Sequence, residues 1–150
     1  MMRLHILLIA AIFSTGISNA TESSGQNIIR GADLNNNGIR DDIDAYISKQ
    51  SYSTAQLAAI TRHARWIQSA VIFTSDNREE ARIIAIEDGK AIDCIYEKFQ
   101  SPDSPANPAA VIIKIESLTV NTPVRKKSYQ KFNELISGMA FQLQQGNTCE

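Results

Sequence analysis

The chain has 150 residues and almost balanced charge, with 15 Lys and Arg against 16 Asp and Glu and a net charge of −1. This balance argues against nucleic acid as a partner, because nucleic-acid-binding proteins carry concentrated positive charge. The length suits one domain with a modest core.

The first twenty residues have the layout of a secretory signal peptide. Arg3 precedes an apolar run from Ile6 to Phe13, and small residues end the segment at Ala20. We expect cleavage after Ala20, which gives a periplasmic or secreted chain of net charge −2. The apolar run is shorter than the ~20 residues that a membrane-spanning helix needs, and no later stretch comes closer. The mature chain is therefore expected to have no transmembrane segment.

Residues 21–31 are polar and lack hydrophobic periodicity. We predict a flexible lead-in here, with no helix before the next segment. Residues 32–150 are predicted to form a single helical domain that begins with a metal-binding loop at residues 33–44.

The loop DLNNNGIRDDID carries oxygen-bearing side chains at nearly every second position. With Asp33 as position 1, they stand at positions 1, 3, 5, 9 and 12, with Gly38 at position 6, and this is the ligand spacing of an EF-hand loop. Position 7 of such a loop contributes a backbone carbonyl. The predicted ion is Ca²⁺, which binds six to eight oxygens, and the predicted ligands are Asp33, Asn35, Asn37, Ile39, Asp41 and Asp44.

Two further points concern this loop. Arg40 and Asp42 stand at the alternate positions, so they are assigned to the surface or to local pairing. The alternative to a metal site is an Asn- and Asp-rich turn that caps the following helix, since these residues favour turns and N-caps.

The stretch resembles the calcium loops of the EF-hand superfamily and, more closely, those of dockerins and thrombospondin type 3 repeats. Those loops also favour aspartate at the last position and often lack the entering helix. The phrase NNNGIRDDID, running into Tyr46-Ile47, is also similar to a motif of small exported bacterial proteins. The resemblance covers residues 31–48 and implies a single structural calcium site. Asp44 in place of Glu, two neutral Asn ligands and the lack of a paired loop place the expected Kd on the order of 10⁻⁴ to 10⁻³ M.

Helical periodicity organises the rest of the chain. A short helix is predicted after Asp41 and ends before Ser51. A longer helix is predicted from an N-cap at Thr54 to about Ser75, followed by one over residues 77–99. The expected buried faces of these two helices are Leu57, Ile60, Ala64, Ile67 and Val71, and Ala81, Ile84, Ile92, Ile95 and Phe99.

Proline marks the start of the last two helices. Asn107-Pro108 opens a segment that runs through Val120, and Thr122-Pro123 opens one that runs to about Leu143. The β-branched run at residues 111–115 is also compatible with a strand, but a single strand among helices has no ladder partner. The predicted fold is therefore all-α, a small antiparallel helical bundle preceded by the calcium-binding loop.

Two cysteines remain after cleavage, Cys94 and Cys149. In an oxidising compartment an even number indicates a disulfide, which here would close a long loop and tie the carboxyl end to an interior helix. The alternative is two unrelated thiols.

Three other features bear on function. His63 is the only histidine of the mature chain, which disfavours histidine-based catalysis and a zinc site. Asp88 lies on an apolar stripe and is expected to pair with Arg62 or Arg65. Arg125, Lys126 and Lys127 begin a helix, where they form either a solvated face or a contact patch for an acidic protein or an anionic envelope surface.

The leading hypothesis is a non-enzymatic, exported protein that calcium stabilises and that binds a macromolecule in the periplasm or outside the cell. One alternative is an immunity or inhibitor protein against a toxin or hydrolase. A second alternative is a cell-wall hydrolase that uses paired carboxylates from Asp88, Asp93 or Glu97, because glycoside hydrolysis needs two acids at a suitable separation.

Overall fold

The computed structural model describes residues 27–101, 103–141 and 146–149. The predicted signal peptide and residues 21–26 lie outside the described residues. Every regular element within them is helical: α2 (Asp41–Ile47), α3 (Thr54–Ile72), α4 (Arg78–Phe99), α5 (Pro108–Thr119) and α6 (Pro123–Ile136). The all-α prediction is confirmed. No described helix combines the length and the hydropathy that a membrane span requires.

Side-chain caps fix where the helices begin. Ser53 accepts a hydrogen bond from the backbone N–H of Gln56, whose side chain accepts one from the backbone N–H of Ser53, so the N-cap of α3 is Ser53 rather than the predicted Thr54. Asn77 and Asn107 each accept hydrogen bonds from two backbone N–H groups at the start of α4 and α5, and Thr122 accepts one at the start of α6. The predicted starts were therefore right to within one residue.

The β-branched run of α5 is helical, as expected. Val111 and Ile115 lie one turn apart and are both buried in the main core, which a strand pairing would not provide. The last helix ends earlier than predicted, at Ile136, and is followed by Gly138 with a φ of 74°. A left-handed backbone of this kind stops a helix, and glycine adopts it without strain.

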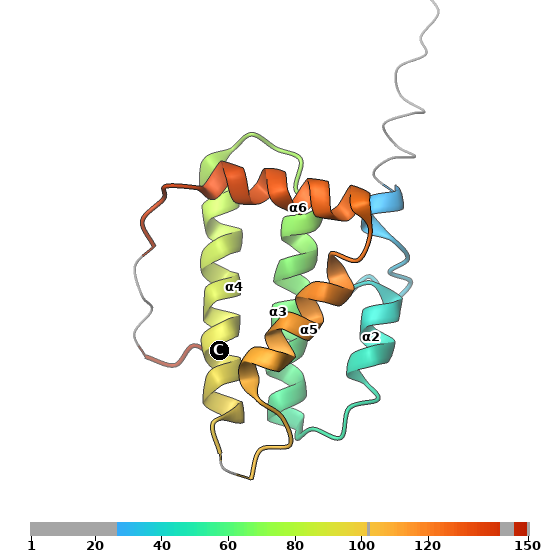
Figure 1. Cartoon of the computed structure of the whole chain (residues 1–150), viewed down its shortest axis with the longest axis vertical. Helices are drawn as coiled ribbons and strands as arrows, with labels where there is room; N and C mark the ends of the chain where they lie inside the picture. The colour runs from blue at the N-terminus through green and yellow to red at the C-terminus, as the bar shows by residue number, and fades with distance from the viewer. Residues whose placement is uncertain (1–26, 102, 142–145, 150) are drawn as a thin grey trace, which may run out of the picture.

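Helix α3 lies at the centre of the molecule (Figure 1). α4 packs against it in the antiparallel direction, α5 and α2 cover other sides, and α6 lies across the ends of α3 and α4 (Figure 1). The predicted antiparallel arrangement therefore holds for the α3–α4 pair, whereas α6 crosses it. The predicted face of α3 is buried at Ile60, Ala64, Ile67 and Val71.

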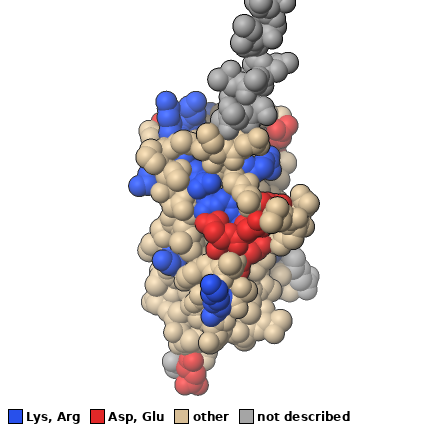
Figure 2. All heavy atoms as spheres, turned by 90° about the vertical axis from the view of Figure 1, so that its right-hand side faces the viewer, with Lys and Arg blue, Asp and Glu red and all other residues tan. Residues whose placement is uncertain are grey.

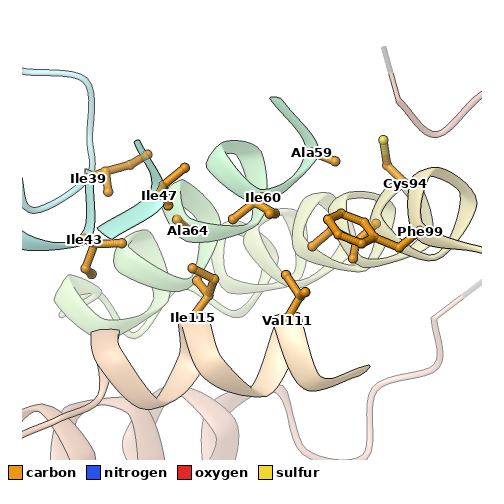
Figure 3. Close-up of a cluster of buried hydrophobic side chains, with 11 residues drawn as sticks. Ile39, Ile43, Ile47, Ala59, Ile60, Ala64, Cys94, Phe99, Val111 and Ile115 are labelled. Carbon is orange, nitrogen blue, oxygen red and sulfur yellow. The ribbon is translucent and has the colours of Figure 1, made fainter. Parts of the chain in front are cut away.

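The main hydrophobic core joins the loop and α2 to the longer helices (Figure 3). Ile39, Ile43 and Ile47 come from the loop and α2, and they pack into the same cluster as Ile60 and Ile115. Burying each of these side chains contributes about 1.5–3 kcal/mol to folding. The segment after residue 38 is therefore an integral part of the core.

Cys94 and Cys149 form a disulfide, with an S–S distance of 2.08 Å and a sequence separation of 55. It ties the end of the chain to α4, as the sequence predicts. This linkage fixes the described carboxyl-terminal residues against the α3–α4 pair, where Arg62 also donates to the backbone oxygen of Thr148 at 2.6 Å.

A helical turn at residues 27–30 precedes the loop, which corrects the prediction that no helix enters it. The turn ends at Gly31, whose φ is 74° and whose N–H donates to the oxygen of Asn27. Gln68 of α3 and Arg125 of α6 donate to its last carbonyls, so tertiary contacts hold a turn that is too short to be stable alone.

Candidate metal centre

The loop at residues 33–44 coils tightly between the 27–30 turn and α2. Its ends meet at a backbone hydrogen bond from Asp41 N–H to the oxygen of Ala32, at 2.9 Å. Two residues in the coil have positive φ, Asn36 at 54° and Gly38 at 84°. Asn and Gly are the residues that tolerate this left-handed backbone best, which is why the sequence NNNG coils here.

Asp33 organises the first half of the coil. One of its carboxylate oxygens accepts from the N–H of Asn37 at 3.1 Å, and the other accepts from the N–H of Gly38 at 3.0 Å. Asp41 acts in a similar way from the far end, since its carboxylate accepts from the N–H of Leu34 at 3.0 Å. Both predicted ligands therefore face the inside of the coil and hold it together.

Asn35, Asn37 and Asp44 meet across the coil. The side-chain amides of Asn35 and Asn37 donate to the same oxygen of Asp44, Oδ2, at 3.2 Å and 2.7 Å. The amide oxygens accept from backbone N–H groups, that of Asn35 from Asn37 and that of Asn37 from Ile39. Positions 3, 5 and 12 of the predicted ligand set are therefore close together.

Ile39, at position 7, has a role that the sequence reading missed. Its side chain is fully buried in the main core, beside Ile43 (Figure 3). The sequence did carry a signal for this role, because Ile39 is followed at helical spacing by Ile43 and Ile47. Core packing thus fixes the backbone from which the position-7 carbonyl would be offered.

The carboxylates of the loop suit a hard cation only if Asn side-chain amides and backbone carbonyls also act as ligands. Within the described residues there is no group of three or more His, Cys, Asp or Glu side chains arranged to hold a metal ion. Calcium also accepts amide and backbone oxygens, and the two Asn amides would present oxygen towards Asp44 if they were turned by 180°. The residues therefore fit calcium through a mixed set of carboxylate, amide and carbonyl oxygens.

Two arginines tie the coil to the surrounding helices. Arg65 of α3 donates from Nε to the backbone oxygen of Asn37 at 2.8 Å. Arg40 is buried, which corrects its assignment to the surface, although its predicted local pairing with Asp42 is present at 2.6 Å. This pairing holds the pKa of the Asp42 carboxyl below its usual value. Figure 2 shows a cluster of acidic side chains in the middle of this face, with basic side chains next to it.

Arg125, Lys126 and Lys127 do not form one contact patch. Arg125 donates to the oxygens of Ile29 and Ile28 at 2.9 Å and 3.1 Å, and burial lowers its pKa. Lys126 lines one surface hollow and Lys127 lines another. The reason is geometric, because consecutive residues of a helix project about 100° apart.

His63 and Asp88 form a pair that the sequence reading missed. His63 is 1% exposed, and its Nδ1 lies 2.7 Å from Oδ1 of Asp88. The expected partners of Asp88 were wrong: Arg62 pairs with Glu87 at 3.0 Å, and Arg65 binds the loop. Burial raises the pKa of Tyr129 to about 12, and the nearby negative charges of Glu116 and Asp88 add to this rise. The sequence signal for this pair was His63 itself, a polar residue on an apolar helix face that needs a hydrogen-bond partner when buried.

Of the three acids of the hydrolase alternative, Asp93 and Glu97 lie one turn apart on the same face of α4, whereas Asp88 lies on a different face. Asp88 faces His63, Glu97 pairs with Lys98 at 2.6 Å, and Asp93 is exposed. None of them lines the hollow beside Phe73 and Phe132, the one beside Ile113 and Lys126, or the one beside the disulfide. The hydrolase alternative therefore receives no support from these hollows and stays a prediction.

Comparisons with protein-family models, with curated proteins and with solved structures find no match to this chain. The function has to be inferred from its own residues.

Proposed function

We propose that the protein is an exported, calcium-stabilised helical protein that binds another macromolecule. The observation that carries the calcium proposal is the meeting of Asn35, Asn37 and Asp44 on one side of the coil, at 3.2 Å and 2.7 Å between the amides and the carboxylate. Residues seven and nine positions apart are brought together there, at loop positions 3, 5 and 12. Oxygen ligands at these positions are what calcium requires of a single short segment.

The role of calcium in this proposal is structural. The coil lies where the 27–30 turn, α2 and the carboxyl end of α5 meet, and it brings the negative charges of Asp33, Asp41 and Asp44 into one short segment. A divalent cation would offset their mutual repulsion and so stabilise this junction. At a free calcium concentration about ten times Kd, the stabilisation is about 1.4 kcal/mol.

Export is supported by the disulfide between Cys94 and Cys149, since such bonds persist in oxidising compartments. It also fits the weak affinity expected of the loop, because millimolar calcium is typical outside the cytosol. An immunity or inhibitor protein is one specific form of the same binding function.

Thermal melting of the purified chain with calcium and then with a chelator tests the calcium proposal. The melting temperature is expected to rise by about 5 °C at saturating calcium and to return with the chelator. Asp44→Asn should remove most of this response. Asp103→Asn is the matched control, because Asp103 is exposed and lies outside the loop.

Titration calorimetry gives the direct measurement. Heat from millimolar calcium that disappears in Asp44→Asn would support the site, whereas no heat in the wild-type chain would refute it. The binding function has a separate test, which is affinity capture from the native envelope with calcium and with chelator.

A further inference from the structure

A groove of about 580 Å³ lies between α6, the connection from α3 to α4 and residue 29. Phe73 and Phe132 contact each other in its lining, edge to face, with ring centroids 5.7 Å apart. Leu135, Val124 and Ile29 complete its apolar surface. Phe132 is also buried against Ala70 of α3 and Ala81 of α4 in the second core cluster, so core packing holds this wall of the groove.

Two lysines give the groove a positive rim. Lys127 and Lys131 are one helical turn apart on α6, so they project on the same side. Neither forms an ion pair within the described residues, in contrast to Lys90 and Lys98. Asp76 is the one acid among the lining residues, and the lining therefore has a formal charge of +1.

We propose that this groove binds a protein segment that presents an aromatic or large aliphatic side chain between carboxylates. The apolar side chain would fill the Phe73–Phe132 surface, and the carboxylates would face Lys127 and Lys131. An apolar anchor in a pocket with complementary charge at its rim is the arrangement that gives interfaces both affinity and specificity. The proposal rests on the macromolecule-binding function proposed above and names the chemistry of the partner.

A protein fits the surroundings of the groove better than a small molecule does. Val124, in the lining, is 39% exposed, and Ile28, next to Ile29, is 62% exposed. Small-molecule sites bury most of the ligand within the pocket, whereas a protein partner also covers apolar side chains around it.

A lipid surface fits less well. Sequences that bind anionic membranes present clusters of 4–8 Lys and Arg, whereas the groove has two lysines with Asp76 beside them. The whole chain has a net charge of −1, so it gains no general attraction to an anionic bilayer.

A second copy of the chain is a more specific competitor. Leu34 is 86% exposed and lies on the acidic loop, so it offers an apolar side chain among carboxylates. However, a loop inserted into a groove elsewhere on the molecule is a head-to-tail contact that need not close. One leucine also buries far less than the ~1,200–2,000 Å² of a stable interface.

Fluorescence polarisation with labelled peptides tests the proposal on the full, disulfide-bonded chain. The probe is acetyl-Glu-Glu-Phe-Leu-Glu-Glu-amide, and the controls replace either every Glu with Gln or Phe-Leu with Ser-Ser. The acidic apolar peptide should bind, and each control should bind at least about fivefold more weakly, because rim charges and the anchor both contribute. Binding should weaken with added salt.

Variants locate the binding site of the peptide. Lys127→Gln combined with Lys131→Gln should weaken binding about tenfold, and Val124→Ser should weaken it by a smaller factor. Asp76→Asn should strengthen binding, since it removes a repelling charge. Lys49→Gln is the matched control, because Lys49 is exposed and lies outside the groove lining. Circular dichroism and melting temperature establish that each variant is folded.

Several outcomes would overturn the proposal. Equal binding of the Glu and Gln peptides, no binding at millimolar concentration, or unchanged binding by the double lysine variant would each do so. Lysine-dependent sedimentation with phosphatidylglycerol vesicles in the absence of peptide binding would assign the groove to a lipid surface. Self-association that Leu34→Ser abolishes would assign it to a second copy. Macromolecule capture that survives the double lysine variant would refute the groove alone and leave the proposed function standing.

Discussion

Arg40 donates a hydrogen bond from Nη1 to the backbone oxygen of Thr119, 79 residues further along the chain, at 3.0 Å. A second bond, from Nη2 to the oxygen of Leu118, is 3.1 Å long. Arg40 precedes α2 and is 3% exposed, so a buried cation covers the last carbonyls of α5. This position favours it electrostatically, because the carboxyl end of a helix carries partial negative charge.

Replacing Arg40 should destabilise the folded protein. Arg40→Met retains much of the buried stem but leaves the Thr119 and Leu118 oxygens without their donors, and we expect a loss of about 2–4 kcal/mol in the free energy of unfolding. Urea denaturation measures it. Arg30→Met is the control, because Arg30 is exposed, and it should change the value by less than about 0.5 kcal/mol. Similar losses in both variants would contradict the role given to Arg40.

The loop glycine should not tolerate a side chain. Gly38 has a φ of 84°, and an added Cβ would lie 3.2 Å from Cγ of Arg65. Gly38→Ala is expected to destabilise the protein by about 1–2 kcal/mol and to weaken calcium binding by distorting the coil. Gly89→Ala is the control, and its effect on stability should have the opposite sign. Gly89 lies in α4, and a Cβ added there would meet open space. Gly89→Ala should stabilise by about 0.5–1 kcal/mol, as thermal or urea unfolding would show.

The buried histidine should depend on its acidic partner. Asp88→Ala leaves Nδ1 of His63 without the acceptor at 2.7 Å, and the Nε2 atom of the same ring has no partner within the described residues. A loss of about 1–3 kcal/mol is expected, and the double change with His63→Leu should cost less than the sum of the two single changes. A double-mutant cycle in urea measures this coupling. Additive losses, or an equal loss in Asp93→Ala, would contradict it.

Low pH should lower the free energy of unfolding, in part because the Glu87 carboxylate becomes protonated. Hydrogen bonds from Lys90 at 2.6 Å and from Arg62 at 3.0 Å hold the pKa of its carboxyl below the usual value of 4.5. Because the folded pKa is the lower one, the stabilisation is present above about pH 4.5 and is lost as the pH falls through the folded pKa. Glu87→Gln should therefore flatten the dependence of unfolding free energy on pH below 5. A variant curve parallel to that of the wild type would be the contrary result.

Loss of the disulfide should lower stability mainly through the unfolded chain. Cys94 and Cys149 are 55 residues apart, for which the chain-entropy model gives roughly 4 kcal/mol as an upper figure. Cys149→Ser is expected to cost about 2–4 kcal/mol in urea denaturation. Reductant should lower the stability of the wild type to a similar level and leave the variant unchanged. A variant as stable as the oxidised protein would refute this expectation.

The local rules of sequence reading identified the elements well. The face of α3, the Asn107 cap and the prolines that open α5 and α6 all follow from residues within a few positions of each other. The predicted face of α4 was right at Ala81, Ile95 and Phe99, whereas Ile84 and Ile92 are only half-buried. The coil at residues 33–44 belongs to the same class, because its turns depend on Asn36 and Gly38 and on short-range bonds from Asp33.

Long-range partners were less predictable. Glu87 and Asp88 are adjacent in α4, and a small rotation of the helix decides which of them meets Arg62 and which meets His63. The charge run at the start of α6 shows the same limit, since its three cations face three different surroundings.

By itself the sequence determined the helical elements, their starts and the oxygen-rich coil, because each depends on neighbouring residues, and its two remaining cysteines were enough to predict their pairing. The tertiary structure alone decided that Ile39 belongs to the core, that Arg40 covers the end of α5, and that Phe73 and Phe132 form a groove with Lys127. The physical reason is that these contacts depend on how whole helices rotate and cross, which no spacing within a single segment specifies.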